Sequence, residues 1–576
     1  IFWGIKGAIT SKTSEDYFVA GRSIGTWVFV LAATATSFSG WTFVGHPGKI
    51  LTDGLPYAFA SFYALTIPFT GVLFLRRQWV LGRVHNYVTP GEMYSDYYGG
   101  NSMRALTVLV AFLFSVPYLG IQLRASGALF NVLTDGLIST NLGMILLSTV
   151  VVIYVASGGL RSVAYVDCAQ AILLALGIVV LGIITIKWIG GWNLFTEGLG
   201  VLVKNDLISG NRLTLEGFSN RVAMPGSIQI VSSGSNAIGG VWTGMMCMTY
   251  MFALMGIQSS PAFSMWAYAN KTSEPFRWQQ VVASSIVIGI ILFTFTIIQG
   301  MGADVLVLNG VFETISDSTL VPKLINLMSQ SAPWLVGLLA VCALAAMQST
   351  GSAYMSTFSA MITRDIYKNY IDEEVSEHKQ KFIGRLFVVV VAAAALVVAI
   401  ISTDALVMLG GLAVAYGFQM YPALFGNLYC KWISRTGVTI GLIAGLLAVT
   451  LTDKMSSLFS LPWGAYPLTI HSAGWGIFFN IIFTCFGSYF FPDSNQRNDN
   501  KEKRHAFLSE VAGIPKSKKK LIPLAYGLVL VWFLFGFGPF AMIGNTLFSD
   551  PNIPCLLYTS DAADEGLGVD LGGRRI

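Results

Sequence analysis

Apolar segments of about 20 residues recur along the whole chain, and a segment of that length crosses a bilayer as an α-helix. Of the 576 residues, 54% are hydrophobic and 11% are charged, whereas roughly 25% of the residues in soluble domains are charged. A membrane β-barrel would instead show shorter strands in which apolar and polar residues alternate. The sequence therefore predicts an all-α polytopic membrane protein embedded in a lipid bilayer.

Thirteen complete spans are predicted, with a truncated span before them in the first residues. Their approximate bounds are 25–46, 55–75, 104–123, 141–157, 166–188, 237–257, 280–301, 333–360, 383–402, 404–429, 436–452, 473–491 and 521–547. Residues 402–404 separate the ninth and tenth spans so narrowly that the two are expected to form a tight helical hairpin.

Lysine and arginine are concentrated in alternate loops between these spans. The segment 76–104 carries four arginines, and the segments 364–385 and 492–520 carry both lysine and arginine, whereas the loop around Lys204 carries only scattered charges. By the positive-inside rule the basic loops face the cytoplasm, which predicts a multi-pass protein of the plasma membrane. The net charge of +5 belongs to these loops, so nucleic acid is not expected as a partner.

The first predicted span has an unusually polar middle. Thr34, Thr36, Ser37 and Ser39 lie close together, and Gly40 follows them. One interpretation is a helix that unwinds inside the membrane, where irregular backbone lines a cavity and its carbonyl groups bind a cation. The other is a tight helix–helix contact built from small residues.

The span order suggests two halves. Because five is odd, spans one to five and spans six to ten would cross the membrane in opposite orientations. The sixth span carries Gly239, Gly240 and Gly244 early in its apolar run. Glycine interruptions at corresponding positions of two halves indicate a transporter binding site.

The eighth predicted span places Ala346, Ser349 and Thr350 at i, i+3 and i+4, on one face of a helix. Two neighbouring hydroxyl groups suit a hard cation such as sodium, which prefers oxygen ligands. The same hydroxyls would also suit a helix–helix contact or hydrogen bonds to the preceding turn. Spacing alone leaves both interpretations open.

Four segments carry a resemblance to a known family. They are YFVAGRSIG at 17–25, SFSGWTFVGHPG at 37–48, SGGLRSVAYVDCAQ at 157–170 and AAMQSTGSAYMSTFSAMITRDIY at 345–367. In order and spacing the chain resembles the sodium:solute symporter family, whose members carry proline, pantothenate, sugars or monocarboxylates.

That resemblance implies a leucine-transporter-type fold with a five-plus-five inverted repeat and extra flanking helices. The corresponding division is 1–24 as a truncated leading span and cytoplasmic link, 25–190 as the first repeat, 191–236 as an extracellular loop, 237–430 as the second repeat, 431–554 as additional spans with the basic loop 492–520, and 555–576 as a tail. The tail resembles a translated sequencing-library adaptor and is expected to be foreign; the alternative is a genuine polar tail.

The resemblance also implies a sodium site between the first and eighth spans. Ala35, Phe38 and Ala346 would offer main-chain carbonyls, while Ser349 and Thr350 would offer hydroxyls. The proline carriers have an aspartate where this chain has a serine at position 37, so a second sodium-linked role there is in doubt.

Two further family positions are charged. Asp167 matches an acidic residue implicated in sodium coupling or release, and Arg22 matches a position near the cytoplasmic gate. The alternatives are a helix N-terminal acid that faces the helix dipole for Asp167 and a plain topology determinant for Arg22.

A substrate cavity near the breaks is expected to draw on polar and aromatic residues, although aromatic residues in membrane helices also serve simply in packing. The candidates are Ser39, Gly40, Gln122, Trp242, Tyr250 and Tyr416. The half-helix N-termini expected in the first and sixth spans suit a carboxylate. This favours an amino acid such as proline, a monocarboxylate or pantothenate over a sugar.

Together these features predict a secondary transporter rather than an enzyme. The sequence contains no nucleotide-binding loop, nucleophile elbow or metal-binding motif, so a primary pump is not expected. Sodium moving down its gradient would carry a small organic solute inward. The alternative is the membrane region of a sensor, since some proteins with this symporter region are fused to a signalling kinase.

Overall fold

The computed structural model describes residues 2–61, 66–214, 217–224, 229–232, 240–401, 406–453 and 461–513, and the single residues 523, 527, 530, 531 and 534. Within this part of the chain the secondary structure is helical, with two isolated β-bridges and no strand. The predicted hairpin turn at 402–404, Gly239, nearly all of the predicted span 521–547 and the tail 555–576 lie outside it. The predicted all-helical architecture is confirmed.

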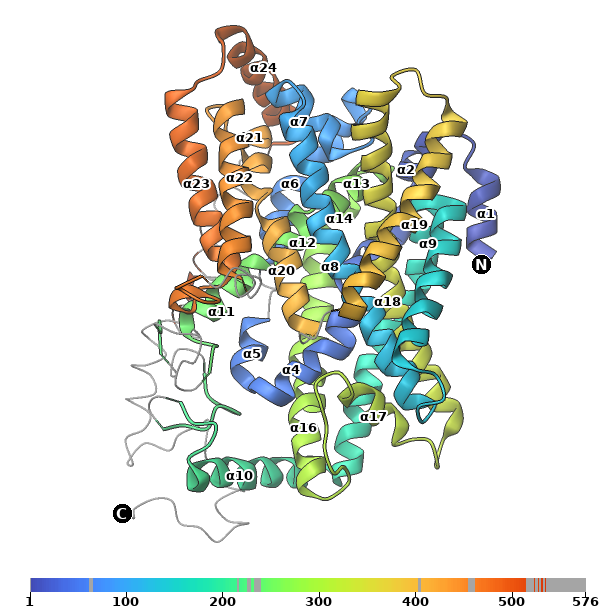
Figure 1. The fold of residues 1–576 in the computed structure, drawn as a ribbon, viewed down its shortest axis with the longest axis vertical. Helices are drawn as coiled ribbons and strands as arrows, with labels where there is room; N and C mark the ends of the chain where they lie inside the picture. Colours follow the sequence, from blue (N-terminus) through green and yellow to red (C-terminus); the bar gives the residue numbers. More distant parts are fainter. Residues whose placement is uncertain are drawn as a thin grey trace.

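Most helices run along the long axis of the molecule (Figure 1). The N-terminal half contains α1 (Phe2–Thr10), α2 (Ser14–Val19), η1 (Ala20–Arg22), α3 (Thr26–Ser37), η2 (Trp41–Gly45), α4 (His46–Asp53), α5 (Leu55–Ala60), α6 (Ile67–His85), α7 (Pro90–Tyr98), α8 (Ser102–Leu133), α9 (Thr140–Ile189) and α10 (Trp192–Ser209).

The second half contains α11 (Gly244–Ala253), α12 (Gly256–Ser259), α13 (Pro261–Ala269), α14 (Pro275–Arg277), η5 (Trp278–Ile288), α15 (Gly289–Ile291), η6 (Leu292–Thr296), α16 (Ile297–Leu308), α17 (Leu320–Asn326), α18 (Pro333–Met361), η7 (Ile362–Ile371) and α19 (Glu377–Ile401). It is followed by α20 (Leu406–Phe418), α21 (Tyr421–Leu428), α22 (Arg435–Thr452), η9 (Pro467–Thr469), α23 (Ser472–Phe490) and α24 (Asn495–Val511).

Seven described helices are long and apolar enough to cross a membrane, or eight if the bent pair at the first span counts as one. The prediction had thirteen spans. Part of the difference arises because several predicted spans are divided into shorter helices. The predicted spans 141–157 and 166–188 lie in α9, whose two helices join at a kink at Gly159.

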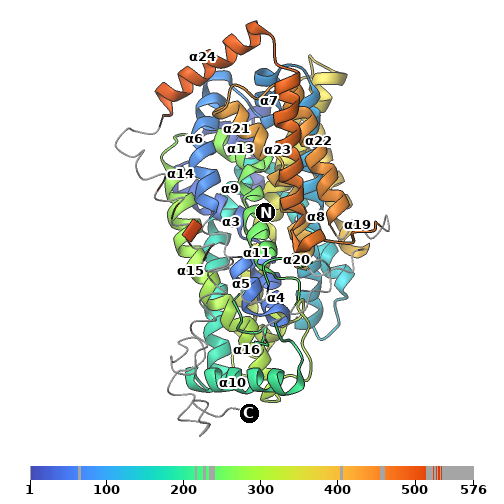
Figure 2. The ribbon, with the colours of Figure 1, turned by 90° about the vertical axis from the view of Figure 1, so that its left-hand side faces the viewer.

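The two ends of the molecule differ in charge. Figure 1 shows α7 and α24, which belong to the basic segments 76–104 and 492–520, at one end of the molecule. Helix α10, which carries Lys204, lies at the other end and crosses the direction of the long helices in both views (Figure 2). The arrangement agrees with the predicted separation of basic and charge-poor loops.

The first span is broken, as the sequence predicts. Helix α3 ends at Ser37, η2 begins at Trp41, and the two parts meet at a bend of 53°. Phe38 takes an extended backbone conformation between them. Its amide donates to the carbonyl of Thr34, 3.1 Å away, which closes the last turn of α3.

The sixth span differs from its prediction. It begins at Gly244 instead of 237 and continues through α13 to Ala269. Its interruption lies near Ser260, which is extended, and not at Gly240, which precedes the first helix. Pro261 explains the position, because the ring of a proline disfavours a helical conformation in the residue before it and itself suits the first turn of a new helix.

Two of the family-like segments pack against each other near the chain start. Gly159 has a φ of +59°, and a Cβ there would lie 2.2 Å from the carbonyl oxygen of Tyr17. Only glycine fits this close approach and left-handed conformation. Two residues later, Arg161 donates to the carbonyl of Ala20 at 2.9 Å. The kink in α9 therefore holds α2 and η1 in place beside it.

Candidate functional site

The backbone break in the first span is held by α8. Gln122 accepts a hydrogen bond from the amide of Gly40 at 2.8 Å, and its own amide group donates to the carbonyl of Tyr118. Ser39 donates to the Tyr118 hydroxyl at 3.5 Å and accepts from the amide of Trp41 at 3.1 Å. These bonds satisfy backbone groups that lose their helical partners at the break.

Gly40 is required by a close approach of three helices. A Cβ at this position would lie 2.8 Å from Cγ of Met347 in α18 and 2.9 Å from Oε1 of Gln122 in α8. The small-residue packing interpretation is therefore also correct for Gly40. The break and the tight contact are two aspects of one structure.

Helix α18 brings its hydroxyls to the last turn of α3. Ser349 Oγ lies 3.2 Å from the carbonyl oxygens of both Ala35 and Ala346. Thr350 Oγ1 lies 3.3 Å from the same Ala35 carbonyl and 3.4 Å from that of Thr36. Here the hydroxyls donate to the carbonyls, so the helix contact and the back-bonding that the sequence also suggested are both present.

The spacing of these oxygens also suits a shared cation. Calcium, a hard ion of similar radius to sodium, binds oxygens at about 2.3–2.6 Å, so adjacent ligands around it lie about 3.3–3.7 Å apart. The separations of Ser349 and Thr350 from the Ala35 carbonyl are 3.2 and 3.3 Å. Small rotations of the Ser349 and Thr350 side chains would direct their hydroxyl oxygens and the Ala35 carbonyl oxygen toward one ion.

Four of the five predicted sodium ligands therefore lie together. Ala35, Ala346, Ser349 and Thr350 share this cluster, and each is buried. Phe38, the fifth, is buried in the extended segment just after α3. The oxygens of this cluster are main-chain carbonyls and hydroxyls and are therefore neutral. The described residues contain no group of three or more His, Cys, Asp or Glu side chains that could hold a metal ion.

Asp167 joins this cluster through a residue that the sequence reasoning missed. Ser352 Oγ lies 3.4 Å from Asp167 Oδ1 and donates to the Ser349 carbonyl at 2.9 Å. Ser352 follows Ser349 by three residues, so the helical spacing that selected Ser349 would also have selected it. Asp167 is fully buried, and its Oδ2 has no hydrogen-bond partner in the described part of the chain.

The helix N-terminal interpretation of Asp167 is wrong. The residue lies in α9 eight positions after the kink at Gly159, whereas the effect of a helix dipole falls off within the first turn. The contacts of Asp167 instead point across to α18.

Arg22 is a buried residue that ties the cytoplasmic link to α6. Its Nη1 and Nη2 atoms each lie 3.1 Å from a carbonyl oxygen, of Gly82 and of Tyr87 respectively, and its Nε donates to Glu15 at 2.5 Å. Arg83 in turn donates to the carbonyl of Arg22 at 2.8 Å. An arginine that only fixed topology would not need the three side-chain contacts to Glu15, Gly82 and Tyr87.

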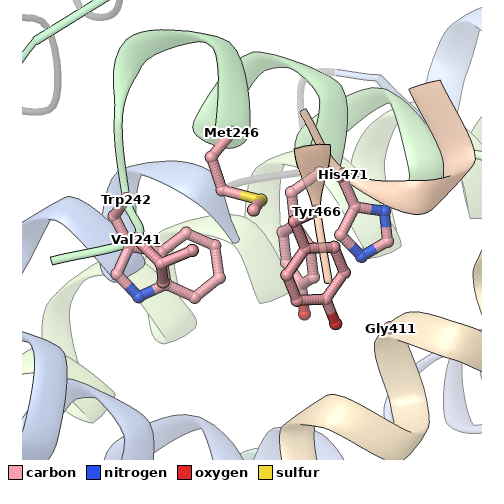
Figure 3. Close-up of a pocket in the computed structure, with 7 residues that line it drawn as sticks. Val241, Trp242, Met246, Gly411, Tyr466 and His471 are labelled. Carbon is pink, nitrogen blue, oxygen red and sulfur yellow. The ribbon is translucent and has the colours of Figure 1, made fainter. Parts of the chain in front are cut away.

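Two of the three aromatic candidates, Trp242 and Tyr250, line a small cavity of about 10 Å³. Figure 3 shows Val241, Trp242 and Met246 on one side of it and Tyr466 and His471 on the other. The ring of Tyr250, which also lines the cavity, lies 5.3 Å from that of Trp242 and 5.1 Å from that of His471. Trp242 and Tyr250 therefore lie together beside this cavity.

Tyr416 does not join that cavity. Its hydroxyl lies 2.9 Å from Thr450 Oγ1 on α22. The part of α20 that reaches the site is its glycine pair instead. A Cβ on Gly410 would lie 2.9 Å from the Trp41 ring beside the break, and one on Gly411 would lie 3.2 Å from His471 Nε2. The two glycines therefore allow α20 to approach both the backbone break and the cavity. A search for aromatic side chains in the sequence could not reveal this role.

Residues 17–445 match the model of the sodium:solute symporter family, which is more than half of the chain. The sodium/proline symporters of Staphylococcus aureus strains JH9 and JH1 are each 26% identical over 465 residues, which cover 78% of this chain and 82% of the relative. Among solved structures, a substrate-bound outward-open Na⁺-coupled sialic acid symporter is similar with a TM-score of 0.66 at 18% identity, over 86% of this chain and 96% of that one. At 18% identity, the similarity to the sialic acid symporter shows a shared fold and nothing more.

Proposed function

This chain belongs to the sodium:solute symporter family, and we propose that it imports a small carboxylate-bearing solute together with Na⁺. Membership makes it a multi-pass secondary transporter of the plasma membrane rather than an enzyme. Sodium is then a co-transported ion and not a resident cofactor. A relative of 26% identity, a sodium/proline symporter, does not fix the solute of this chain.

At the level of the fold, we propose a five-plus-five inverted repeat within thirteen spans. Two interrupted helices support it. The first span breaks between α3 and η2, and the sixth is interrupted between α12 and α13. Breaks at corresponding positions of two halves are typical of transporters whose substrates bind near the middle of the membrane.

The observation that carries the function is the cluster of Ser349 and Thr350 on the Ala35 carbonyl. In the proposal, Na⁺ binds among the oxygens of Ala35, Phe38, Ala346, Ser349 and Thr350. The ion would hold the last turn of α3 against α18. Its binding would therefore favour the conformations in which these helices are close, which is a population shift.

Asp167 and Arg22 have proposed roles in coupling and gating. Asp167 would sense the occupied site through Ser352 and Ser349. Arg22 would hold the cytoplasmic link against α6 and Tyr87 until the inner side opens. Each Na⁺ that moves inward gains about 2.3 kcal/mol per 100 mV of membrane potential, which drives the solute against its gradient.

For the substrate, we propose a cavity beside the break that involves Ser39, Gly40 and Gln122, with Trp242 and Tyr250 on the neighbouring wall. The half-helix N-termini at the two interruptions suit a carboxylate. Tyr416 is left out of this cavity because it contacts α22.

Uptake into proteoliposomes tests the proposal. Radiolabelled proline, pantothenate, lactate and glucose are offered under an inward Na⁺ gradient and, as a control, under an equal K⁺ gradient. Accumulation of at least one carboxylate with Na⁺ alone is expected. Three results would contradict the proposal: equal uptake with both gradients, uptake that a sodium ionophore does not reduce, or uptake of glucose alone.

A further inference from the structure

The cavity in Figure 3 is smaller than the proposed solutes. Its volume of about 10 Å³ leaves room for about one water molecule, whereas proline, lactate and pantothenate are all larger than water. Helices supply two of its walls: α11 contributes Met246 and Tyr250, and α20 contributes Gly411. A further wall is formed by Tyr466 and His471, which precede α23. One wall must therefore move before a solute can enter.

The wall that Tyr466 and His471 form belongs to the connection between α22 and α23. Residues 466–471, here called the strap, contain only the three-residue helix η9. The rings of Tyr466 and His471 stack with their centres 5.5 Å apart, across the cavity from Trp242 and Met246 (Figure 3). Helices α22 and α23 extend from the strap toward the end of the molecule that carries α24 (Figure 1). Since α24 belongs to a basic segment, the strap lies at the outer ends of both helices.

The backbone of the strap is strained. Tyr466, Leu468 and Thr469 have φ angles between +51° and +56°, and they are three of the eight non-glycine residues with positive φ in the described part of the chain. This left-handed conformation is uncommon for any side chain and least favourable for a β-branched one such as threonine. Strained backbone of this kind is typical of ligand clamps and switch segments. Loss of the contacts of the strap would therefore favour a different conformation.

Hydroxyl groups hold the strap against the first helix of the sixth span. Thr469 Oγ1 lies 2.8 Å from Thr243 Oγ1, and the amide of His471 donates to Thr249 Oγ1 at 2.9 Å. Thr243 caps α11 and Thr249 lies within it, so both bonds connect the strap to the helix that forms the opposite wall. A hydrogen bond between neutral groups contributes little net stability, so these contacts can open and close readily.

We infer that the strap is the outer lid of the solute cavity and closes by joining Thr469 to Thr243. In the closed form the stacked rings of Tyr466 and His471 cover the cavity from the outside. Opening separates the two threonines, relaxes the strained backbone and widens the cavity for a solute. The inference rests on the proposed function, and it adds the wall that moves, in a segment that follows the ten spans of the proposed repeat.

A reversible cross-link tests whether the strap must move. In a full chain whose native cysteines are replaced, Thr243→Cys/Thr469→Cys puts two sulfurs where hydroxyl oxygens lie 2.8 Å apart, and a small rotation brings them to the disulfide length of about 2.05 Å. The matched control is Ser102→Cys/Thr439→Cys, a hydroxyl pair 3.3 Å apart that joins α8 to the opposite end of α22. Counting free thiols in the purified protein measures the extent of each cross-link.

Uptake into proteoliposomes is measured for both pairs, oxidised and then reduced with dithiothreitol. The oxidised Thr243/Thr469 pair is expected to lose sodium-dependent uptake, and reduction should restore it in the same sample. The Ser102/Thr439 pair should transport equally in both states, because the proposal leaves that end of α22 in place. Comparison of one protein in two redox states separates locking of the lid from any folding effect of the substitutions.

A second measurement follows access to the cavity and needs no solute. Met246→Cys, in the wall opposite the strap, is labelled from outside intact cells with an impermeant methanethiosulfonate. Thr469→Val removes the hydroxyl that holds the strap and should raise the labelling rate about fivefold, as expected for the loss of one hydrogen bond. Thr439→Val removes a hydroxyl at the other end of α22 and should leave the rate unchanged.

Three results would overturn the inference. They are full uptake by the completely cross-linked Thr243/Thr469 pair, an equal loss of uptake in both cross-linked pairs, and a labelling rate of Met246→Cys that Thr469→Val does not change.

The two proposals fail in different ways. A reduced protein that accumulates no solute under a sodium gradient would contradict the proposed function, while the labelling rates would still report whether the strap covers the cavity. Sodium-dependent uptake that persists after complete cross-linking would leave the proposed function intact and overturn only the lid.

Discussion

The hydroxyl of Ser349 lies 3.2 Å from the carbonyl oxygen of Ala35, 314 residues earlier in the chain. The contact joins the middle of α18 to the last turn of α3, directly before the backbone break. An ion that binds both oxygens must therefore fix the distance between these helices. This geometry links ion binding to the position of the broken span.

Gly40 should not tolerate a side chain. In Gly40→Ala the new Cβ would lie 2.8 Å from Met347 Cγ and 2.9 Å from Gln122 Oε1, so one of these side chains must shift, and a shift of Gln122 disturbs its hydrogen bond to the amide at position 40. Sodium-dependent uptake and the thermal midpoint are both expected to fall. Gly351→Ala is the matched control on α18, because a Cβ there meets nothing within 4 Å. Alanine in that helix should be neutral or stabilising by about 0.4–1 kcal/mol. Equal effects of the two changes would show that the close approach at Gly40 is unimportant.

The charge of Asp167 should matter more than its shape. Asp167→Asn keeps the size of the side chain and its contact with Ser352 but removes the charge. The half-saturating sodium concentration is expected to rise at least about fivefold, a coupling of ordinary size. Ser352→Ala should act in the same direction, and Glu374→Gln, which changes an exposed carboxylate, should not. Normal sodium activation in well-expressed Asp167→Asn would assign the residue to packing.

Arg22 should stabilise the link between η1 and α6. Arg22→Ala leaves the carbonyls of Gly82 and Tyr87 without this donor, and an unsatisfied buried group costs roughly 1–3 kcal/mol. The thermal midpoint in detergent should fall clearly. Arg277→Ala removes an exposed ion pair with Glu274, worth about 0–1 kcal/mol, and should change it little. A similar small change in both variants would argue that Arg22 has only a topological role.

Labelling tests the predicted orientation of the membrane spans. In a chain whose native cysteines are replaced, Lys204→Cys in α10 should react with an impermeant maleimide added to intact cells. Val84→Cys, 54% exposed at the opposite end of the molecule, should react only after the cells are opened. The reverse pattern would invert the proposed topology.

The sequence predicted what depends on local chemistry and helical spacing. The polar segment before Gly40 marked the break, and the i, i+3, i+4 pattern marked Ser349 and Thr350. Positions that depend on contacts between distant segments were harder to predict. The sixth span was divided at its glycines, yet the interruption lies at Ser260 because Pro261 starts a new helix.

Side-chain direction was the other source of error. Tyr416 was assigned to the cavity for its aromatic character, but the packing of α20 turns it toward Thr450. The residues of α20 that approach the site, Gly410 and Gly411, have no side chain to suggest a role.

The central claim is that Ser349 and Thr350 bind sodium. Replacing both with alanine removes two oxygen ligands from a site whose other proposed ligands are main-chain carbonyls. A matched double variant, Ser356→Ala/Thr357→Ala, removes the same pair of hydroxyls seven residues further along α18.

The decisive measurement is the sodium activation curve for uptake of a fixed, saturating solute by wild type and both double variants. In the Ser349/Thr350 variant the half-saturating sodium concentration should rise at least tenfold, about 1.4 kcal/mol. By linkage, solute binding should weaken at low sodium and much less at saturating sodium. The Ser356/Thr357 variant should follow wild type. An unchanged half-saturation in a well-expressed Ser349/Thr350 variant would contradict the sodium site.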